Sequence, residues 1–399
     1  MKNSSVCVIG LGYIGLPTAA LIASSGHNVL GVDINKKIIS KIKTGKAHID
    51  EPDLDSVVKR VVRSKALTVS IEPRFSDVFL IAVPTPFKRG NKPDLSFVEA
   101  AIDSILPYIR KGNTIILEST CPVGTTEKLI VLKLKEKGFD IDKDVYIAYC
   151  PERVLPGQIL RELVSNDRIV GGINNISSGR IKEFYRTFVK GEVFTTNART
   201  AELAKLAENS FRDVNIAFSN ELSMICKHMN IDSSELIQLT NRHPRVKILN
   251  PGPGVGGHCI AVDPWFIVNS APKQAKLIKM AREVNNSKVD WVVKDIIENI
   301  TKYNKPIVGI FGLTYKQDVG DLRESPSLEI ALKLKKMGYR IICSEPNRSE
   351  KEIKGLKILN IKDITKKANV LVFLVSHREY AKLGILNSKY KLVLKYVNI

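Results

Sequence analysis

The sequence lacks most of the features that mark secreted, membrane or metal-binding proteins. Its 399 residues contain six scattered cysteines and no C-x-x-C pair, which argues against a disulfide framework or a zinc ribbon. Apolar runs such as VFLIAV are far too short to span a bilayer, and the N-terminus lacks a signal-peptide pattern. The six histidines show no ligand spacing such as H-x-x-x-H. We therefore expect a cytoplasmic protein with no membrane insertion and no metal.

Positive charge is what the chain has in excess. It carries 61 Lys and Arg against 41 Asp and Glu, a formal net charge of +20, which favours anionic partners. The basic residues are spread along the whole chain, without a dense basic arm or a basic run interleaved with aromatics. We therefore expect no nucleic acid partner, and phosphate-bearing small molecules fit better.

The hydrophobic pattern divides the chain into three segments, in line with the two or three domains that 399 residues predict. In residues 1–197 and 303–399, short apolar runs alternate with amphipathic stretches, which is typical of a doubly wound parallel sheet. Residues 198–302 instead show helical spacing, beginning with a helix of about thirty residues. The predicted fold class is α/β, with two Rossmann-like doubly wound domains joined by a central all-helical segment. Its long spine helix is the expected contact of a homodimer.

A glycine motif near the N-terminus predicts a dinucleotide site. VIGLGYIGLP places Gly10, Gly12 and Gly15 in the G-x-G-x-x-G spacing, directly after a predicted strand and at the start of a predicted helix. Gly10 permits the tight turn, Gly12 lets the backbone approach a pyrophosphate, and Gly15 allows close helix packing. Asp33 ends the second strand, where a carboxylate accepts hydrogen bonds from an adenosine ribose and favours NAD over NADP. The alternative is a plain glycine-rich turn with Asp33 on the surface.

A second glycine-rich stretch, PGPGVGGHCIAVDPWF, surrounds a thiol. Residues 251–266 hold four glycines before Cys259, and Asp263 follows four residues later. Glycines before a nucleophilic thiol let a substrate come close and leave backbone N–H groups available. The alternative is a buried cysteine beside a turn. His258 is adjacent to the thiol, but we assign it no role.

Polar residues on the long helix and after two strands add candidates. Lys205, Asn209 and Arg212 are spaced i, i+4 and i+7, so they share one helix face that suits an anion or a developing oxyanion. A solvated helix face explains the same spacing. Thr120 and Glu152 follow predicted strands, at the edge where doubly wound sheets bind ligands, unless both belong only to turns.

Taken together, these segments resemble the UDP-glucose/GDP-mannose dehydrogenase family. The resemblance runs from residue 6 to about residue 330 and is carried by GLGYIGLP, AVPTPFKRGNKPDLSFVEAA, ESTCPVGTTEK, YCPERVLPGQ, AELAKLAENSFRDVNIAFSNEL, NRHPRV, PGPGVGGHCIAVDPWF and FGLTYKQDVGDLRESPSLEI. The chain departs from the family in its last strand, which reads LVLKYVNI.

The resemblance implies an NAD-dependent, four-electron oxidation of a UDP-sugar at C6, from alcohol to carboxylate. Cys259 would capture the C6 aldehyde as a thiohemiacetal and then carry a thioester that water cleaves. NRHPRV and PGQ favour UDP-N-acetyl-D-mannosamine as the substrate and UDP-N-acetyl-D-mannosaminuronate as the product. UDP-N-acetylglucosamine, UDP-glucose and GDP-mannose remain alternatives.

The resemblance also implies roles for single residues. Lys205 would be the acid/base and oxyanion partner, and Asn209, supported by Asp263, would hold the oxyanion or a water. Thr120 and Glu152 would activate water for thioester hydrolysis. Cofactor contacts are implied for Gly10, Gly12, Tyr13, Ile14, Gly15, Asp33, Thr85, Thr120 and Arg323. Nucleotide-sugar contacts are implied for Arg153, Val154, Lys205, Asn209, Arg212, His243, Arg245, Gly256, Tyr315 and Lys316.

A binding protein without catalysis is the contrasting class. The net charge would suit a dimer that senses NAD or binds nucleic acid. That interpretation leaves Cys259, Lys205 and Asn209 without a purpose, so we favour the enzyme.

Overall fold

The computed structural model describes residues 3–88, 90–257, 259–381 and 392–398. The chain forms two compact units, Met1–Ala207 with Trp265–Ser270 and Glu208–Pro264 with Ala271–Ile399. The boundary between them falls inside the long helix, so the division into domains 1–197, 198–302 and 303–399 stays a prediction. Within the described residues, no helix is long and apolar enough to cross a membrane.

An eight-stranded sheet, in the order β10-β9-β8-β7-β4-β1-β2-β3, forms the centre of the first unit. Its strands are β1 (Ser5–Ile9), β2 (Asn28–Val32), β3 (Leu67–Ser70), β4 (Val78–Ile81), β7 (Thr114–Leu117), β8 (Tyr146–Tyr149), β9 (Arg168–Gly172) and β10 (Val193–Asn197). A separate two-stranded hairpin joins β5 (Phe87–Lys88) to β6 (Lys92–Pro93). The apolar runs therefore form strands, as the sequence predicts.

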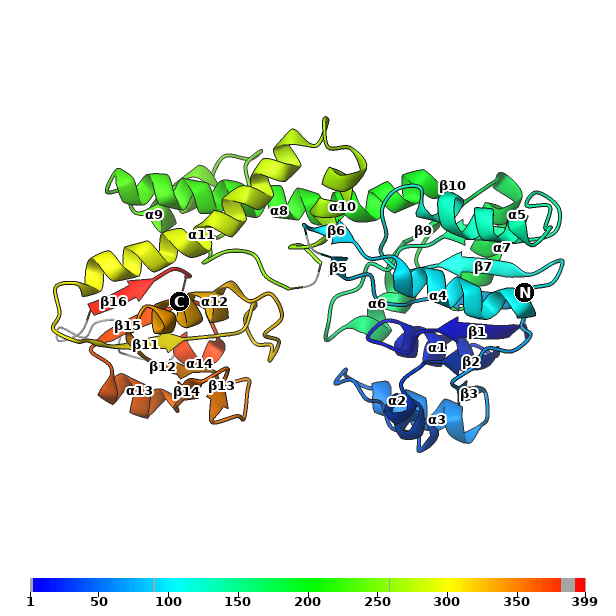
Figure 1. Cartoon of the computed structure of the whole chain (residues 1–399), viewed down its shortest axis with the longest axis horizontal. Helices are drawn as coiled ribbons and strands as arrows, with labels where there is room; N and C mark the ends of the chain where they lie inside the picture. The colour runs from blue at the N-terminus through cyan, green and yellow to red at the C-terminus, as the bar shows by residue number, and fades with distance from the viewer. Residues whose placement is uncertain (1–2, 89, 258, 382–391, 399) are drawn as a thin grey trace. The chain divides into compact units, whose positions relative to one another are not determined.

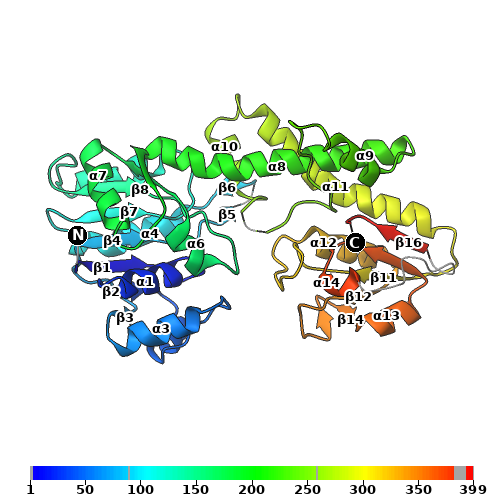
Figure 2. The same ribbon diagram turned by 180° about the vertical axis from the view of Figure 1, so that it is seen from behind.

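Helices cover both faces of this sheet. Figure 1 shows α4 (Ser96–Ile105) in front of the strands. Figure 2, seen from behind, shows α6 (Ile159–Ser165) and α7 (Asn175–Tyr185) on the opposite face of the sheet. The remaining helical segments of the unit before the long helix are α1 (Gly15–Ser24), α2 (Lys36–Lys43), α3 (Leu54–Arg63), the short turns Leu106–Tyr108 and Thr126–Val131, and α5 (Leu132–Glu136). Val6 and Val8 of β1 enter one core and Cys7 and Ile9 enter the other, because successive strand residues face opposite sides. A strand buried on both faces reads as a continuous apolar run.

One step of the sheet contradicts the predicted parallel arrangement. β8 and β9 pair antiparallel, whereas β9 and β10 run parallel to each other. The connecting segment stays at the carboxyl end of β8, because the buried Glu51 carboxylate accepts hydrogen bonds from the backbone N–H groups of Gly157 (2.9 Å) and Ile159 (2.7 Å). The seven-residue α6 does not return the chain to the opposite edge. β9 therefore starts where β8 ends.

A six-stranded sheet, in the order β13-β14-β12-β11-β15-β16, lies in the second unit. Its strands are β11 (Ile307–Phe311), β12 (Arg340–Ser344), β13 (Glu352–Ile353), β14 (Leu356–Ile358), β15 (Val370–Phe373) and β16 (Leu392–Lys395). Its helices are α12 (Pro326–Lys336), α13 (Ile361–Lys367) and α14 (Arg378–Ala381). The divergent LVLKYVNI segment supplies β16, which pairs parallel with β15 and places Lys395 beside Phe373.

The helical middle of the chain contains the expected long helix. α8 (Ala198–His228) has 31 residues, and α9 (Ser233–Thr240) and α11 (Lys276–Ile300) are further helices of this segment. A short helix, α10 (Asp263–Ser270), begins inside the glycine-rich stretch 251–266. Its Asp-Pro start is a common signal for a helix N-terminus, so this helix was predictable.

Candidate functional site

The candidate residues fall into two groups, one in each unit. The first unit holds Gly10, Gly12, Tyr13, Ile14, Gly15, Asp33, Thr85, Thr120, Glu152, Arg153, Val154 and Lys205. The second unit holds Asn209, Arg212, His243, Arg245, Gly256, Cys259, Asp263, Tyr315, Lys316 and Arg323. His258 lies outside the described residues.

The three motif glycines meet different local constraints. Gly10 has a φ of 91°, in the region that favours glycine. A Cβ on Gly15 would lie 1.8 Å from the carbonyl oxygen of Gly10, so no side chain fits there. A Cβ on Gly12 would meet nothing within 4 Å, so the backbone at this residue is open to a ligand. With α1 beginning at Gly15, this loop fits a pyrophosphate.

Asp33 braces the same loop. It lies just past β2, and its two carboxylate oxygens accept hydrogen bonds from the backbone N–H groups of Leu11 (2.9 Å) and Asn35 (2.8 Å). Each oxygen keeps a second lone pair, so the ribose contact expected from the sequence stays chemically open. Asp33 thus has a structural task that the sequence did not indicate.

Two further loops meet at the carboxyl ends of β4 and β7. The Ser119 hydroxyl accepts a hydrogen bond from the Val83 N–H (2.9 Å), which ties the loop carrying Thr85 to the loop carrying Thr120. Glu202 of α8 anchors the second loop. Its buried carboxylate accepts hydrogen bonds from the N–H (2.8 Å) and hydroxyl (2.7 Å) of Thr126 and from the Gly124 N–H (2.5 Å).

Glu202 was not a sequence candidate, although it stands three residues before Lys205 on the same helix. Burial raises the pKa of its carboxyl group, while the bonds to Thr126 and Gly124 lower it. One turn of α8 therefore connects the loop that carries Thr120 to the candidate Lys205. The sequence could have indicated this role of Glu202. In the AELAK segment the acid lies on the buried side of the helix, and a buried acid needs a hydrogen-bonding partner.

Glu152 lies in a buried ion pair. Its carboxylate contacts the Arg168 guanidinium at 2.8 Å, and the exposed fractions of the two residues are 8% and 2%. Its other oxygen accepts a hydrogen bond from the Arg153 N–H at 2.6 Å. Both oxygens are thus held by the chain, and Arg168 was missed at the sequence level.

A second buried carboxyl group lies behind this pair. Glu118, two residues before Thr120, accepts a hydrogen bond from the Tyr185 hydroxyl at 2.6 Å. Burial raises the pKa of Glu118 to about 7; the Arg168 charge opposes the shift and the Glu152 charge adds to it. Burial also raises the pKa of the neighbouring Cys150 to about 12, so that thiol stays protonated near neutral pH.

Tyr13 and the loop that carries Arg153 and Val154 share an anchor. The Tyr13 hydroxyl contacts Glu51 at 3.4 Å, and the same carboxylate holds the N–H groups of Gly157 and Ile159. Glu51, another residue without a motif, thus joins the glycine loop to the loop after β8.

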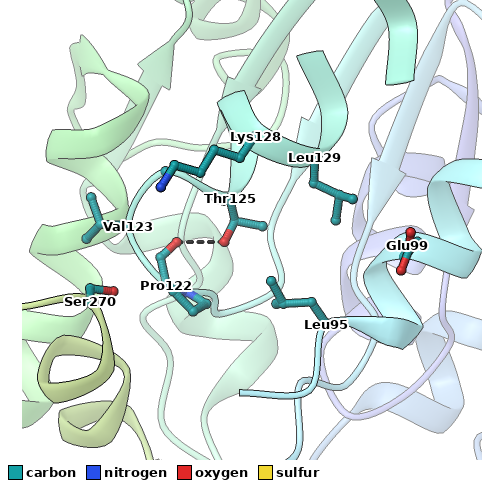
Figure 3. Close-up of a pocket in the computed structure, with 9 residues that line it drawn as sticks. Leu95, Glu99, Pro122, Val123, Thr125, Lys128, Leu129 and Ser270 are labelled. Carbon is teal, nitrogen blue, oxygen red and sulfur yellow. Dashed lines mark hydrogen bonds between the residues drawn. The ribbon is translucent and has the colours of Figure 1, made fainter. Parts of the chain in front are cut away.

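A pocket of about 380 Å³ in the first unit lies beside the segment 122–129. Figure 3 draws its lining residues, which are Leu95, Glu99, Pro122, Val123, Gly124, Thr125, Lys128, Leu129 and Ser270. The Thr125 hydroxyl donates a hydrogen bond to the Pro122 carbonyl at 2.7 Å and closes the turn on one side. The pocket contains none of the candidate catalytic side chains, so we assign it no role.

The thiol loop dominates the second group. Cys259 is exposed, and the other five cysteines are buried. The backbone N–H groups of Val262 (3.0 Å) and Asp263 (2.8 Å) donate to the Cys259 carbonyl, which closes the loop into one turn. The buried Asp263 carboxylate accepts a hydrogen bond from the Asn209 amide at 2.6 Å. The structure therefore brings Asp263 and Asn209 together at the turn that begins at Cys259.

The glycines before Cys259 pack against a loop of the C-terminal sheet. A Cβ on Gly256 would lie 2.4 Å from the Glu324 carbonyl oxygen and 2.7 Å from the Tyr315 Cβ. The Gly257 N–H donates to the Arg323 carbonyl at 3.2 Å, and the Arg323 guanidinium pairs with Asp321 at 2.7 Å. The structure thus brings Gly256, Tyr315 and Arg323 to the thiol loop.

Electrostatic interactions link the same residues. Burial raises the pKa of the Tyr315 hydroxyl, the negative charges of Asp321 and Cys259 raise it further, and the Arg323 and Arg212 charges lower it. Lys316 is exposed beside Tyr315. His243 and Arg245 lie on an exposed turn after α9, where the Arg245 N–H contacts His243 Nδ1 at 3.4 Å.

A buried polar network anchors the start of the thiol loop. Asn220 of α8 accepts a hydrogen bond from the Gly252 N–H (2.8 Å) and donates to Asn285 of α11 (2.9 Å). Asn285 in turn donates to Asp213 (2.8 Å), which pairs with the buried Arg282 (2.6 Å). No motif revealed this network, because its members are far apart in sequence.

Three successive segments match one protein family. Residues 4–189 match the NAD binding domain of the UDP-glucose/GDP-mannose dehydrogenase family, residues 199–287 its central domain and residues 309–398 its UDP binding domain. Together these matches cover most of the chain.

Individual relatives are similar over almost their whole length. An NDP-N-acetyl-D-galactosaminuronic acid dehydrogenase of Ralstonia nicotianae is 47% identical over 390 residues, covering 95% of this chain and 92% of the relative. A UDP-N-acetyl-D-mannosamine dehydrogenase of Escherichia coli K12 is 49% identical over 400 residues, covering 95% of both. The solved structure of the UDP-N-acetyl-mannosamine dehydrogenase Cap5O of Staphylococcus aureus has a TM-score of 0.90 at 43% identity and covers 99% of both chains.

The glycine loop predicts opposite outcomes for two matched substitutions. Gly15→Ala forces a Cβ against the Gly10 carbonyl, so we expect a loss of about 2 kcal/mol or more in the free energy of unfolding. Gly12→Ala adds a methyl group to open space, so we expect an unchanged melting temperature without NAD and weaker NAD binding. Thermal melting and NAD titration of both variants test this. Equal melting temperatures for the two variants would contradict the packing argument.

Proposed function

The chain belongs to the UDP-glucose/GDP-mannose dehydrogenase family, and from this premise we propose that it oxidises UDP-N-acetyl-D-mannosamine at C6 to UDP-N-acetyl-D-mannosaminuronate. The observation that carries the mechanism is Cys259, the exposed cysteine among six, in a loop whose glycines lie against Tyr315 and Arg323. An exposed thiol in such a setting suits covalent capture of an aldehyde.

Cys259 splits the second oxidation into two easier steps. The sulfur adds to the C6 aldehyde and forms a thiohemiacetal, which loses its C6 hydrogen with two electrons and becomes a thioester. NAD supplies the electron acceptor for both oxidations, so each sugar yields two NADH. We assign Lys205 as the acid/base and oxyanion partner, and Asn209 as the donor that holds the oxyanion or a water. The 2.6 Å bond between Asn209 and Asp263 supports this, because it fixes the orientation of the amide.

Hydrolysis of the thioester needs an activated water. Glu152 suits this role because a carboxylate can accept a proton from water. Thr120 supplies a half-buried hydroxyl at the same sheet edge. The pairing of Glu152 with Arg168 supports this assignment, because it fixes the position of the carboxylate.

The remaining candidates serve as ligand contacts in this proposal. The cofactor contacts are Gly10, Gly12, Tyr13, Ile14, Gly15, Asp33, Thr85, Thr120 and Arg323. The contacts to the UDP-sugar are Arg153, Val154, Lys205, Asn209, Arg212, His243, Arg245, Gly256, Tyr315 and Lys316. We also propose that the chain works as the three domains 1–197, 198–302 and 303–399, and that it acts in the cytoplasm, where thiols stay reduced.

A homodimer through α8 completes the proposal. Phe211, Phe218 and Ile225 are 71%, 55% and 48% exposed and follow one another at intervals of seven residues, so they share one face of the helix. Met229, 60% exposed, continues this stripe. Large apolar side chains at heptad spacing are typical of a helix that packs against a second copy.

A panel of nucleotide sugars tests the substrate. We expect UDP-N-acetyl-D-mannosamine to give two NADH per sugar and the highest kcat/KM. The panel also includes UDP-N-acetylglucosamine, UDP-N-acetylgalactosamine, UDP-glucose and GDP-mannose, because some relatives of this chain are named for a different sugar. A higher kcat/KM for any of these would transfer the assignment to that sugar. NADH formation with none of them would reject the enzyme.

Substitution of the thiol tests the mechanism. Cys259→Ser should reduce the formation of the C6 carboxylate by at least about a thousandfold, because serine forms no thioester. NADH and product are measured together by absorbance and chromatography. Cys226→Ala removes a buried cysteine of α8 and is the matched control, which should keep activity. A normal yield of two NADH per sugar from Cys259→Ser would contradict the thioester route.

Charge on the α8 stripe tests the dimer. We expect Phe218→Asp to convert the dimer to a monomer in sedimentation velocity, because a carboxylate in an apolar helix contact is left unpaired. Met337→Asp, on an exposed methionine at the end of α12, is the control and should leave the dimer intact. Identical sedimentation of both variants and the wild type would place the contact elsewhere.

A further inference from the structure

Arg168 lies buried against Glu152, although no sequence motif indicates it. The guanidinium and carboxylate are 2.8 Å apart, and both side chains are almost completely buried. A buried ion pair adds little to stability compared with apolar residues of the same size, because both charges lose their hydration. Stability therefore does not explain why this ion pair lies at the edge of the sheet where the candidate residues are found.

The antiparallel step in the first sheet creates the contact. β8 and β9 pair Ala148 with Gly172 and Tyr149 with Gly171. Continuing this register by three residues places Glu152 opposite Arg168, the first residue of β9. A parallel β9 would begin at the other edge of the sheet, far from Glu152. The antiparallel direction of β9 thus places Arg168 at the carboxyl end of β8.

Among the groups around Arg168, Glu152 is the carboxylate that forms an ion pair with it. Glu118 also faces the guanidinium, but its Oε1 is held by the Tyr185 hydroxyl at 2.6 Å. The guanidinium lies over the Tyr185 ring at 5.6 Å, and the Cys150 thiol is a further neighbour. Stacking over the ring and pairing with Glu152 orient the planar guanidinium from two sides. Arg168 is therefore fixed before any substrate binds.

We propose that Arg168 is the positioning residue that holds the Glu152 carboxylate in the orientation needed for thioester hydrolysis. This inference rests on the proposed function, which assigns water activation to Glu152. In that step the water oxygen attacks the thioester carbonyl carbon while Glu152 accepts the water proton. The carbon–sulfur bond then breaks and Cys259 leaves as a thiolate. The step consumes no oxidant, so Arg168 affects hydrolysis and leaves both oxidations unchanged.

Arg168→Gln in the full-length protein separates hydrolysis from oxidation. With NAD and UDP-N-acetyl-D-mannosamine, we expect a rapid burst of two NADH per active site, as the wild type gives in its first turnover. The steady rate that follows should fall by between about tenfold and a hundredfold, because the base is no longer held. Intact-mass spectrometry should then show the sugar acid attached to Cys259.

Rescue by hydroxylamine distinguishes a role in hydrolysis from a merely structural role, because hydroxylamine would not restore the rate of a misfolded variant. It cleaves thioesters without an activated water, so it should restore most of the steady rate of Arg168→Gln and barely change that of the wild type. Arg186→Gln is the matched control, because Arg186 is exposed, follows Tyr185 and pairs only at the surface with Glu183 in the contact at 3.0 Å. This control should show wild-type bursts and steady rates.

Two outcomes would overturn the proposal: a wild-type steady rate in Arg168→Gln, or a reduced burst that hydroxylamine does not rescue. If Arg168→Gln does not fold, Arg168→Lys decides, because it keeps the charge and loses the planar fork. We expect about a tenfold slower steady rate with hydroxylamine rescue, and wild-type hydrolysis would contradict the role. Failure of the proposed function is a separate result, seen as no NADH from the wild type.

Discussion

The pairing of β1 with two parallel neighbours is the constraint on which the first unit depends. β1 lies between β2 and β4, and the chain leaves it toward β2 and β3 on one side and returns through β4, β7 and β8 on the other. Loops that leave in opposite directions open a crevice at the carboxyl end of the central strands. The glycine loop follows β1. Asp33 follows β2, Thr85 follows β4, Thr120 follows β7 and Glu152 follows β8. The strand order around β1 therefore places residues more than a hundred positions apart in the sequence at the same end of the sheet.

Buried hydrogen-bond acceptors help to hold the loops at this edge. Glu51, Glu202 and Glu152 each accept hydrogen bonds from backbone N–H groups of loop residues. A buried N–H left without a partner costs about 1–3 kcal/mol, so each carboxylate offsets a penalty that an irregular loop would otherwise carry. Asn220 does the same for the thiol loop of the second unit. Loops that carry chemistry are thus fixed without filling the space that a ligand needs.

Periodicity predicted the strands, the long helix and the two sheets, because these depend on residues close together in the sequence. The antiparallel β9 was not predictable in the same way, since apolar runs carry no direction. The segment that leads to β9 is held by hydrogen bonds from the Gly157 and Ile159 N–H groups to Glu51, about a hundred positions away in the sequence. α10 is different, because its Asp-Pro start is a helix signal that the sequence itself carries.

Motifs and the family resemblance pointed to the candidate residues themselves, and they did not point to the residues that support them. Arg168 looks like an ordinary charged residue at the start of a strand, and Glu118 like a turn residue before Thr120. Only the fold shows that both are buried and face each other. Single-sequence reasoning sees residue type and spacing, whereas the partner of a buried charge is set by which strands pair and in which direction.

Burial distinguishes Cys259 from the other five cysteines. It raises the pKa of Cys7 and of Cys150 to about 12, and the pKa of Cys121 well above its usual value. Because the thiolate is the nucleophile, such groups are almost wholly unreactive near neutral pH. Cys259 is exposed instead, in a loop whose glycines pack closely against Tyr315 and Pro326. Burial therefore removes the other five thiols from water, and the glycines let the Cys259 loop approach Tyr315 more closely than larger residues could.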